Sequence, residues 1–282
     1  MLQIQAYRPL QLREFHDRNR PDAAHPIGAD DLAAFLREPG RWRKTEAGLV
    51  VPGAQDLANR QSFLQTVYDG AGFKTPIVVP PLPRITDKQK TALARFGLEM
   101  FYLPAIGEDA YPNDWVKPAW GKYLTMSNIQ RRALPGKWIA VETIAKCDWN
   151  DPVGYGGGND PVTAALRLAK RFAISWDDHH ARRGTLARFA KLGGFPKQGT
   201  RFGTAEEANF IGNLCNLLRE KHGQAHLPNL GQTNSWEWCE NTCESGNRLV
   251  VGDSVLGGLS AVRRDWLGVP YVSIAFRVLV VL

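Results

Sequence analysis

The stretch that decides the expected fold is NSWEWCENTCESGNRLVVGDS, residues 234–254. It places Trp236 and Trp238 one residue apart, Cys239 and Cys243 four positions apart, and then continues into an apolar run that ends at Gly252. Three interpretations follow from these residue types: a metal or thiol site, a packed core, or the frame of a binding surface. The C-x-x-x-C spacing is wider than that of zinc ribbons and redox pairs, and no second pair completes a tetrahedral set, so we expect no metal here.

Composition indicates an ordered, globular chain. The 282 residues, 44% hydrophobic and 22% charged, are enough for one large domain or two modest ones, and we favour two. The net charge is +7, but the basic residues are spread along the sequence without a stripe of interleaved aromatics, so nucleic-acid binding is not expected. The amino terminus is too charged for a signal peptide, and no apolar run has the length of a membrane span. We expect no membrane insertion, and the localisation stays open between the cytoplasm and a virion.

Local patterns predict several elements. Helices are expected at 28–40, at 86–97 with Thr86 as N-cap and Gly97 after the end, and from Asp160 with Pro161 at the first helical position. The clearest helix spans 204–223, opened by a capping box of Thr204 and Glu207. Residues 75–85 are expected to be extended and 136–149 to be a strand. Alternating apolar residues from 272 to 282 predict one central closing strand.

Other polar motifs are weak candidates for a site. In SWDDHHARRG, residues 175–184, adjacent side chains point in different directions, so an exposed polar turn is expected rather than a metal site. GYGGGNDP, 154–161, lacks the features of a phosphate-binding loop. WND, 149–151, is similar to part of a lectin calcium site, but its companion triplet is missing. The four cysteines are expected to be reduced and buried or half-buried.

The order of motifs after residue 200 resembles the C-type lectin fold of the formylglycine-generating-enzyme type. The matching segments are RFGTAEEANFIGNLCNLL (201–218), NSWEWCEN (234–241), RLVVGDS (248–254), SAVR (260–263) and IAFRVLVVL (274–282). The resemblance implies an α+β fold in which the segment around Trp236 and Trp238 is structural. Residues 1–115 are then an accessory domain of unknown fold, 116–282 the C-type lectin-like domain, and about 234–282 its variable region.

Two branches of this family compete. In the enzymes, a pair of cysteines in the segment that follows the counterpart of RLVVGDS binds copper, whereas the matching residues 253–266 here contain no cysteine. The other branch is the variable proteins of diversity-generating retroelements, whose carboxyl-terminal repeat is rewritten at template adenines. Its pattern is similar to Gly252, Ser254, Gly257, Ser260, Ala261, Arg263, Trp266, Pro270, Ile274, Phe276 and Arg277. Ala275 and Asp253 depart from it, because glycine is usual at both positions.

The composition of the last segment agrees with the second branch. Adenine-directed mutation of AAC or AAT codons cannot produce Lys, Glu, Gln, Met or Trp. Residues 246–282 contain no Lys, Glu, Gln or Met, although the chain holds 38 of them. Buried strands also lack these residues, so ordinary core remains an alternative.

The resemblance implies a non-enzymatic receptor-recognition protein with no cofactor and no metal, whose partner is a protein or another ligand on a cell surface. The scaffold residues are Trp236, Trp238, Trp266, Phe276 and Arg277. The variable, ligand-binding positions are Asp253, Val255, Leu256, Leu259, Val262, Arg264, Asp265, Leu267, Val269 and Tyr271. The alternatives are an oxidoreductase of the formylglycine-generating type with non-standard metal ligands and a calcium-dependent lectin. Oligomeric state, ligand identity and viral or cellular source stay open.

Overall fold

The computed structural model describes residues 43–45, 48–50, 54–105, 119–120, 133–224, 227, 233–242, 247–252, 261–265 and 268–282. Before residue 59, and at 119–120 and 261–265, it describes the backbone alone. The predicted helix at 28–40 lies outside these ranges. The helices are α3 (Ala54–Gly70), α4 (Asp87–Phe96), α5 (Pro161–Leu166), α6 (Trp176–His180), α7 (Thr185–Gly193) and α8 (Ala205–Lys221), with a 3-10 turn η5 (Tyr155–Gly158).

The strands of the described residues form three sheets. They are β1 (Arg43–Thr45), β2 (Gly48–Val50), β3 (Leu98–Leu103), β4 (Ala119–Trp120), β5 (Lys137–Glu142), β6 (Thr200–Arg201), β7 (Trp236–Thr242), β8 (Arg248–Gly252), β9 (Ala261–Asp265), β10 (Ile274–Ala275) and β11 (Leu279–Val281). β1 and β2 form a hairpin, β3-β5-β11-β6 a four-stranded sheet, and β10-β7-β8-β9-β4 a five-stranded sheet. The class is therefore α+β, as predicted.

Side-chain and backbone capping contacts define where three of the predicted helices begin or end. Thr86 caps α4 in a capping box with Gln89, and Gly97 ends it in the left-handed conformation, φ 64°. Thr204 and Glu207 form the predicted capping box of α8, which ends at Lys221. Asp160 caps α5 through the amides of Val162 and Thr163, but that helix is only six residues long. The predicted cap residues are confirmed, as is the helix start at Pro161.

The closing segment differs from the single central strand that was predicted. It is divided into β10, which pairs in parallel with β7, and β11, which pairs with β5 and β6 in the other sheet. Ile274, Phe276, Val278 and Val280 are fully buried as expected, whereas Val272 is 58% exposed. The segment from 274 to 281 thus joins the two sheets. Period-two alternation continues through the change of sheet, so the sequence pattern does not reveal the break.

The expected boundary near residue 116 does not separate two cores in the described residues. β3, on its amino-terminal side, pairs with β5 over six residues, from Leu98 opposite Glu142 to Leu103 opposite Lys137. One apolar core holds side chains from Leu64 in α3 to Val280 in β11. Residues 60–105 therefore belong to the same packed body as the residues after 133.

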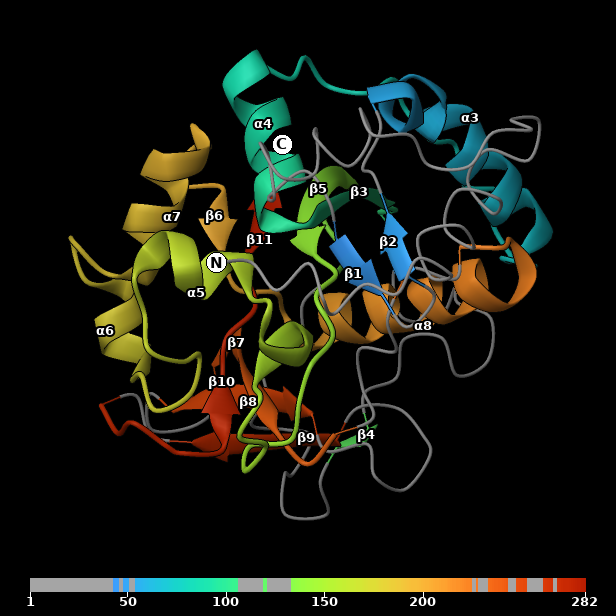
Figure 1. Ribbon diagram of the computed structural model, residues 1–282. Coiled ribbons are helices and arrows are strands. Elements are labelled where there is room, and N and C mark those ends of the chain that lie inside the picture. The colour runs from blue at the N-terminus through green and yellow to red at the C-terminus, as the bar shows by residue number, and fades with distance from the viewer. Residues whose placement is uncertain are drawn as a thin grey trace.

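Helices cover both sheets (Figure 1). α3, α4 and α7 contact the four-stranded sheet at β3 and β6, and α8 contacts β7 and β8 of the five-stranded sheet. In the view of Figure 1, α4, α5, α6 and α7 lie together on the left, and the five-stranded sheet lies below them. Within the described part of the chain, no helix is both long and apolar enough to cross a membrane.

Candidate functional site

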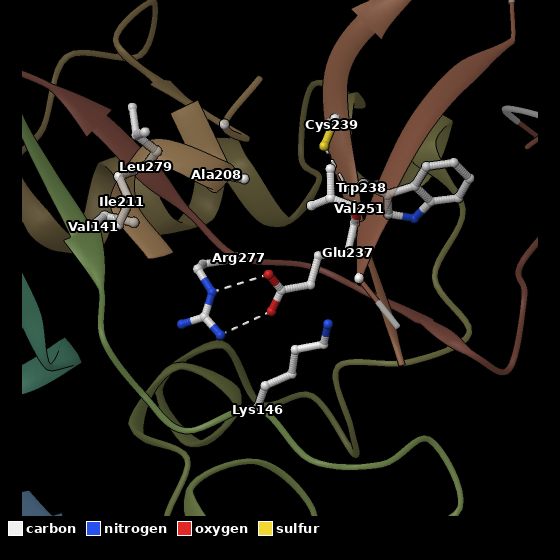
Figure 2. A pocket seen from close by; sticks show the side chains of 12 residues that line it. Val141, Lys146, Ala208, Ile211, Glu237, Trp238, Cys239, Val251, Arg277 and Leu279 are labelled. Carbon is white, nitrogen blue, oxygen red and sulfur yellow. Dashed lines mark hydrogen bonds and ion pairs between the residues drawn. The ribbon is translucent and has the colours of Figure 1, made fainter. Parts of the chain in front are cut away.

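A buried ion pair joins strand β7 to the segment between β10 and β11. Glu237 lies on β7 between the two tryptophans, and Arg277 lies between β10 and β11. The guanidinium contacts both carboxylate oxygens, Nη2 to Oε1 at 2.9 Å and Nε to Oε2 at 3.1 Å (Figure 2). Its Nη1 donates to the carbonyls of Glu142 and Ile144 at 2.7 and 3.0 Å. Arg277 therefore connects the five-stranded sheet to the end of β5 in the four-stranded sheet.

A second arginine cluster lies beside the first. Arg171, 2% exposed, contacts Asp160 through Nε and Nη2 at 2.5 and 2.6 Å, and Glu142 Oε2 through Nη1 at 2.5 Å. Glu142 Oε1 accepts the amide of Val278 at 2.7 Å. Tyr155 links the clusters, because its hydroxyl donates to Glu237 Oε1 at 2.8 Å and its ring lies 4.7 Å from the Arg171 guanidinium.

The carboxylates of these clusters differ in their proton affinity. Burial opposes ionisation of Glu237, but Arg277 and Lys146 outweigh it, so the pKa of Glu237 is lowered. Arg171 likewise outweighs burial at Asp160 and lowers the pKa of that carboxyl. At Glu142 burial is the stronger effect and raises the pKa, although Arg171 and Arg277 oppose it. Glu237 and Asp160 are therefore anionic partners in the frame, and Glu142 is the carboxyl most ready to hold a proton.

A cavity of about 40 Å³ lies against the Arg277–Glu237 pair, room for a few water molecules. Figure 2 shows Lys146 directed towards the Glu237 carboxylate on one side, with Ile211 and other apolar side chains on the opposite side. Gly252 closes one wall at φ 153°, where a Cβ would lie 2.2 Å from Ser235 O and 2.7 Å from Lys146 Nζ. Only glycine fits at this position. The arrangement suits internal solvent around a buried ion pair.

The thiols near this frame do not have the properties of nucleophiles. Cys147, Cys215 and Cys239 are free and buried, as predicted, and Cys243 lies outside the described residues. Burial raises the pKa of Cys147 and Cys215 to about 12, and raises that of Cys239 well above its usual range. Over the part of the chain that is described, no group of three or more His, Cys, Asp or Glu side chains could hold a metal ion.

The expected scaffold residues are largely placed. Trp236 is 8% exposed and Trp238 2%, Phe276 is fully buried, and Arg277 forms the ion pair described above. The Trp238 indole N–H donates to the Ile174 carbonyl at 3.2 Å. Trp236, Trp238 and Phe276 are therefore core residues, and their role as the frame of a binding surface stays a prediction. Trp266 lies outside the described residues.

The expected variable positions are placed only in part. Val262, Arg264 and Asp265 lie on β9, an inner strand between β8 and β4 whose backbone alone is described. Val269 is 43% exposed, in a loop where Gly268 and Pro270 are exposed too. Tyr271 is half-buried and its ring lies 6.5 Å from that of Trp238, so it packs against the frame and is not a fully outward side chain. The remaining positions lie outside the described residues: Asp253, Val255, Leu256, Leu259 and Leu267.

The segment 175–184 is not the exposed turn that was predicted. Its first half forms α6, capped by Ser175, and His179 is fully buried against the rings of Phe202 and Phe276. Neither ring nitrogen of His179 has a hydrogen-bond partner among the described residues. Burial lowers the pKa of His179 to about 3. His179 is therefore a neutral core residue, while Asp177 and Asp178 are exposed.

Comparison with known proteins finds no family model, no curated protein and no solved structure that matches this chain. The site must therefore be interpreted from its own geometry.

Together the two ion clusters and Lys146 form what we call the buried polar frame. Sequence patterns missed most of it. Glu142, Lys146, Tyr155, Arg171 and Glu237 were not singled out, because their partners lie as many as 136 residues away, as between Glu142 and Val278. One usable signal was present. Glu237 stands between two tryptophans in a strand, and a charged residue in such apolar surroundings requires a partner of opposite charge.

Proposed function

We propose that this chain is a non-enzymatic ligand-binding protein, the product of a diversity-generating retroelement, which displays exchangeable side chains on a C-type lectin scaffold of the formylglycine-generating-enzyme type. The observation behind the proposal is the division of one short segment. Gly268, Val269, Pro270 and Val272 are exposed, while each residue from Ile274 to Val280 is at most 9% exposed. Exchange of the first set can alter recognition while the second set maintains the fold.

The buried polar frame supports the same division. A diversified surface needs a backbone that stays in place while its side chains change. Arg277 holds the residues that follow the exposed loop to β7 and β5, and Trp236 N donates to Ser273 O at 2.9 Å directly after the loop. We therefore expect the loop to meet its ligand as a preformed patch, with little change of backbone. The partner is a protein or another ligand of a cell surface, met through Val and Tyr flanked by charged residues.

A display experiment tests the proposal. One library randomises the exposed positions 268, 269, 270 and 272, and a matched library randomises the buried positions Ile274, Phe276, Val278 and Val280. Both are selected for folding and then for binding to an unrelated protein such as lysozyme. Most clones of the first library should fold and some should bind, whereas the second should yield few folded clones. Equal loss of folded clones in both libraries would contradict the proposal.

A genomic observation provides an independent test. The gene should be accompanied by a reverse transcriptase gene and by a second, near-identical copy of the sequence that encodes the carboxyl-terminal residues, with differences confined to adenines. A locus without either element would leave a binding protein of fixed specificity.

A further inference from the structure

Four helices form a continuous layer on one side of the molecule. Lys88 Nζ of α4 donates to the Lys191 carbonyl of α7 at 3.0 Å, and Gln89 Nε2 donates to the Gly194 carbonyl at 3.2 Å. α5 contacts both α4 and α7, and α6 contacts α7. Figure 1 shows α5, α6 and α7 on the left and α4 above them, with α3 and α8 on the right.

The positive charge of the chain is concentrated in this layer. Residues 84–97 and 160–200, which contain the four helices and their connections, hold 12 of the 35 basic and 4 of the 28 acidic residues. Their net charge is +8, so the remainder of the chain has 23 basic and 24 acidic residues and a net charge of −1. The sequence suggested dispersed basic residues, because the two ranges are separated by more than sixty positions. The fold brings them together.

All but one of these basic side chains face solvent. Arg171 is buried in its ion cluster, and the other eleven are exposed: Arg84, Lys88, Lys90, Arg95, Arg167, Lys170, Arg182, Arg183, Arg188, Lys191 and Lys197. Lys90 pairs with Asp87 at 3.0 Å. Among the described residues, no carboxylate lies within ion-pair distance of the other ten. We call these eleven residues the basic helical face.

We propose that the basic helical face binds double-stranded nucleic acid through its phosphates, without reading base sequence. Duplex DNA has a phosphate charge every 3.4 Å along each strand, and release of its counterions favours binding by such a face. On α7, Arg188 and Lys191 lie one helical turn apart on the surface, about 5–6 Å between Cβ atoms, so they can contact successive phosphates. None of the eleven basic residues belongs to the loop at 268–272, although that loop lies against the layer, since Ala173 N donates to Tyr271 O at 3.1 Å. The inference does not rest on the ligand-binding function proposed above.

The residue types favour a duplex over other anionic partners. Single strands are bound by stacking bases on exposed aromatic rings, but every aromatic residue in these two ranges is buried: Phe96, Phe172, Trp176, Phe189 and Phe195. Stable attachment to a membrane surface combines charge with inserted apolar area. In the same ranges Leu192, 40% exposed, is the single exposed large hydrophobic residue.

The test uses the full-length chain and a labelled 20-base-pair DNA duplex of arbitrary sequence, with fluorescence anisotropy from 50 to 200 mM KCl. One variant combines Lys88→Gln, Arg188→Gln and Lys191→Gln. The control combines Lys74→Gln, Lys137→Gln and Lys221→Gln, which are also exposed but lie outside the layer, so both variants have the same net charge. Far-UV circular dichroism and melting temperature verify that both are folded.

The wild-type protein should bind the duplex with a Kd in the micromolar range at 50 mM KCl and weaken steeply with salt. If Lys88, Arg188 and Lys191 each contact one phosphate, the wild type should lose about 40-fold more affinity between 50 and 200 mM KCl than the variant that lacks these three cations. The control should retain the wild-type slope. Equal losses in the two variants would assign the effect to net charge and overturn the proposal. Absence of duplex binding at 50 mM KCl, or binding only to vesicles containing phosphatidylserine, would also overturn it.

Discussion

The exposed loop at 268–272 and the buried segment at 274–280 are separated by one residue, yet their environments are opposite. Val272 is 58% exposed and Val269 43%, whereas Phe276 and Val278 are fully buried. The difference does not come from hydrophobicity, because both segments are rich in valine. It comes from position, since the second segment passes between the two sheets and the first ends before it reaches them. Similar side chains can therefore have different roles a few residues apart.

The largest change in the free energy of unfolding is expected at the Arg277–Glu237 ion pair, which holds the buried segment. Arg277→Met should lower the free energy of unfolding by about 3–5 kcal/mol, because it leaves the Glu237 carboxylate buried without its partner. Urea denaturation measures the loss. The double variant Glu237→Leu with Arg277→Met should recover part of it, since no uncompensated charge remains. A loss below about 1 kcal/mol in the single variant would show that this ion pair does not hold the segment.

An intermediate effect is expected at His179, beneath the same segment. Its pKa of about 3 in the folded protein lies below the value of about 6.5 for an unfolded chain, so protons bind the unfolded state more tightly. Stability from this group is complete at higher pH and is lost as pH falls below about 6.5. Between pH 6.5 and 5 the loss should be about 1.5 kcal/mol.

The variant His179→Phe should lack this contribution. The raised pKa of Glu142 acts in the opposite direction, because the folded protein then takes up a proton first as pH falls. Glu142 is present in both proteins, so the difference between the two stability curves isolates His179. Parallel curves between pH 6.5 and 5 would mean that the imidazole is not the source of the pH dependence.

The smallest effect is expected in the exposed loop. Val269→Ser combined with Val272→Ser should change the free energy of unfolding by no more than about 0.5 kcal/mol, as is usual for exposed positions. Val278→Ser is the matched control in the buried segment, where an unpaired hydroxyl adds about 1–3 kcal/mol to the cost. Thermal and urea unfolding of the three proteins compare them directly. Similar losses in both variants would remove the distinction between loop and frame.

Sequence patterns were reliable where the structure is decided locally. The caps of α4, α5 and α8 depend on side chains that contact amides two or three residues away, and each predicted cap residue is found in place. The polar frame could not be derived in this way, because Arg277 finds its partners 40 and 135 residues away. The break between β10 and β11 was missed for the same reason. Both depend on which sheets meet, and hydrophobic alternation does not encode that.

The position of β11 has a consequence for the order in which this protein can fold. Its strand lies between β5 and β6, so the four-stranded sheet is incomplete until residues 279–281 are available. On the ribosome, β3 and β5 emerge long before them, and β5 keeps an unpaired edge during that interval. Completion of the sheet therefore waits until residues 279–281 have been synthesised, and a nascent chain interrupted before residue 279 would present a site for strand pairing with other chains.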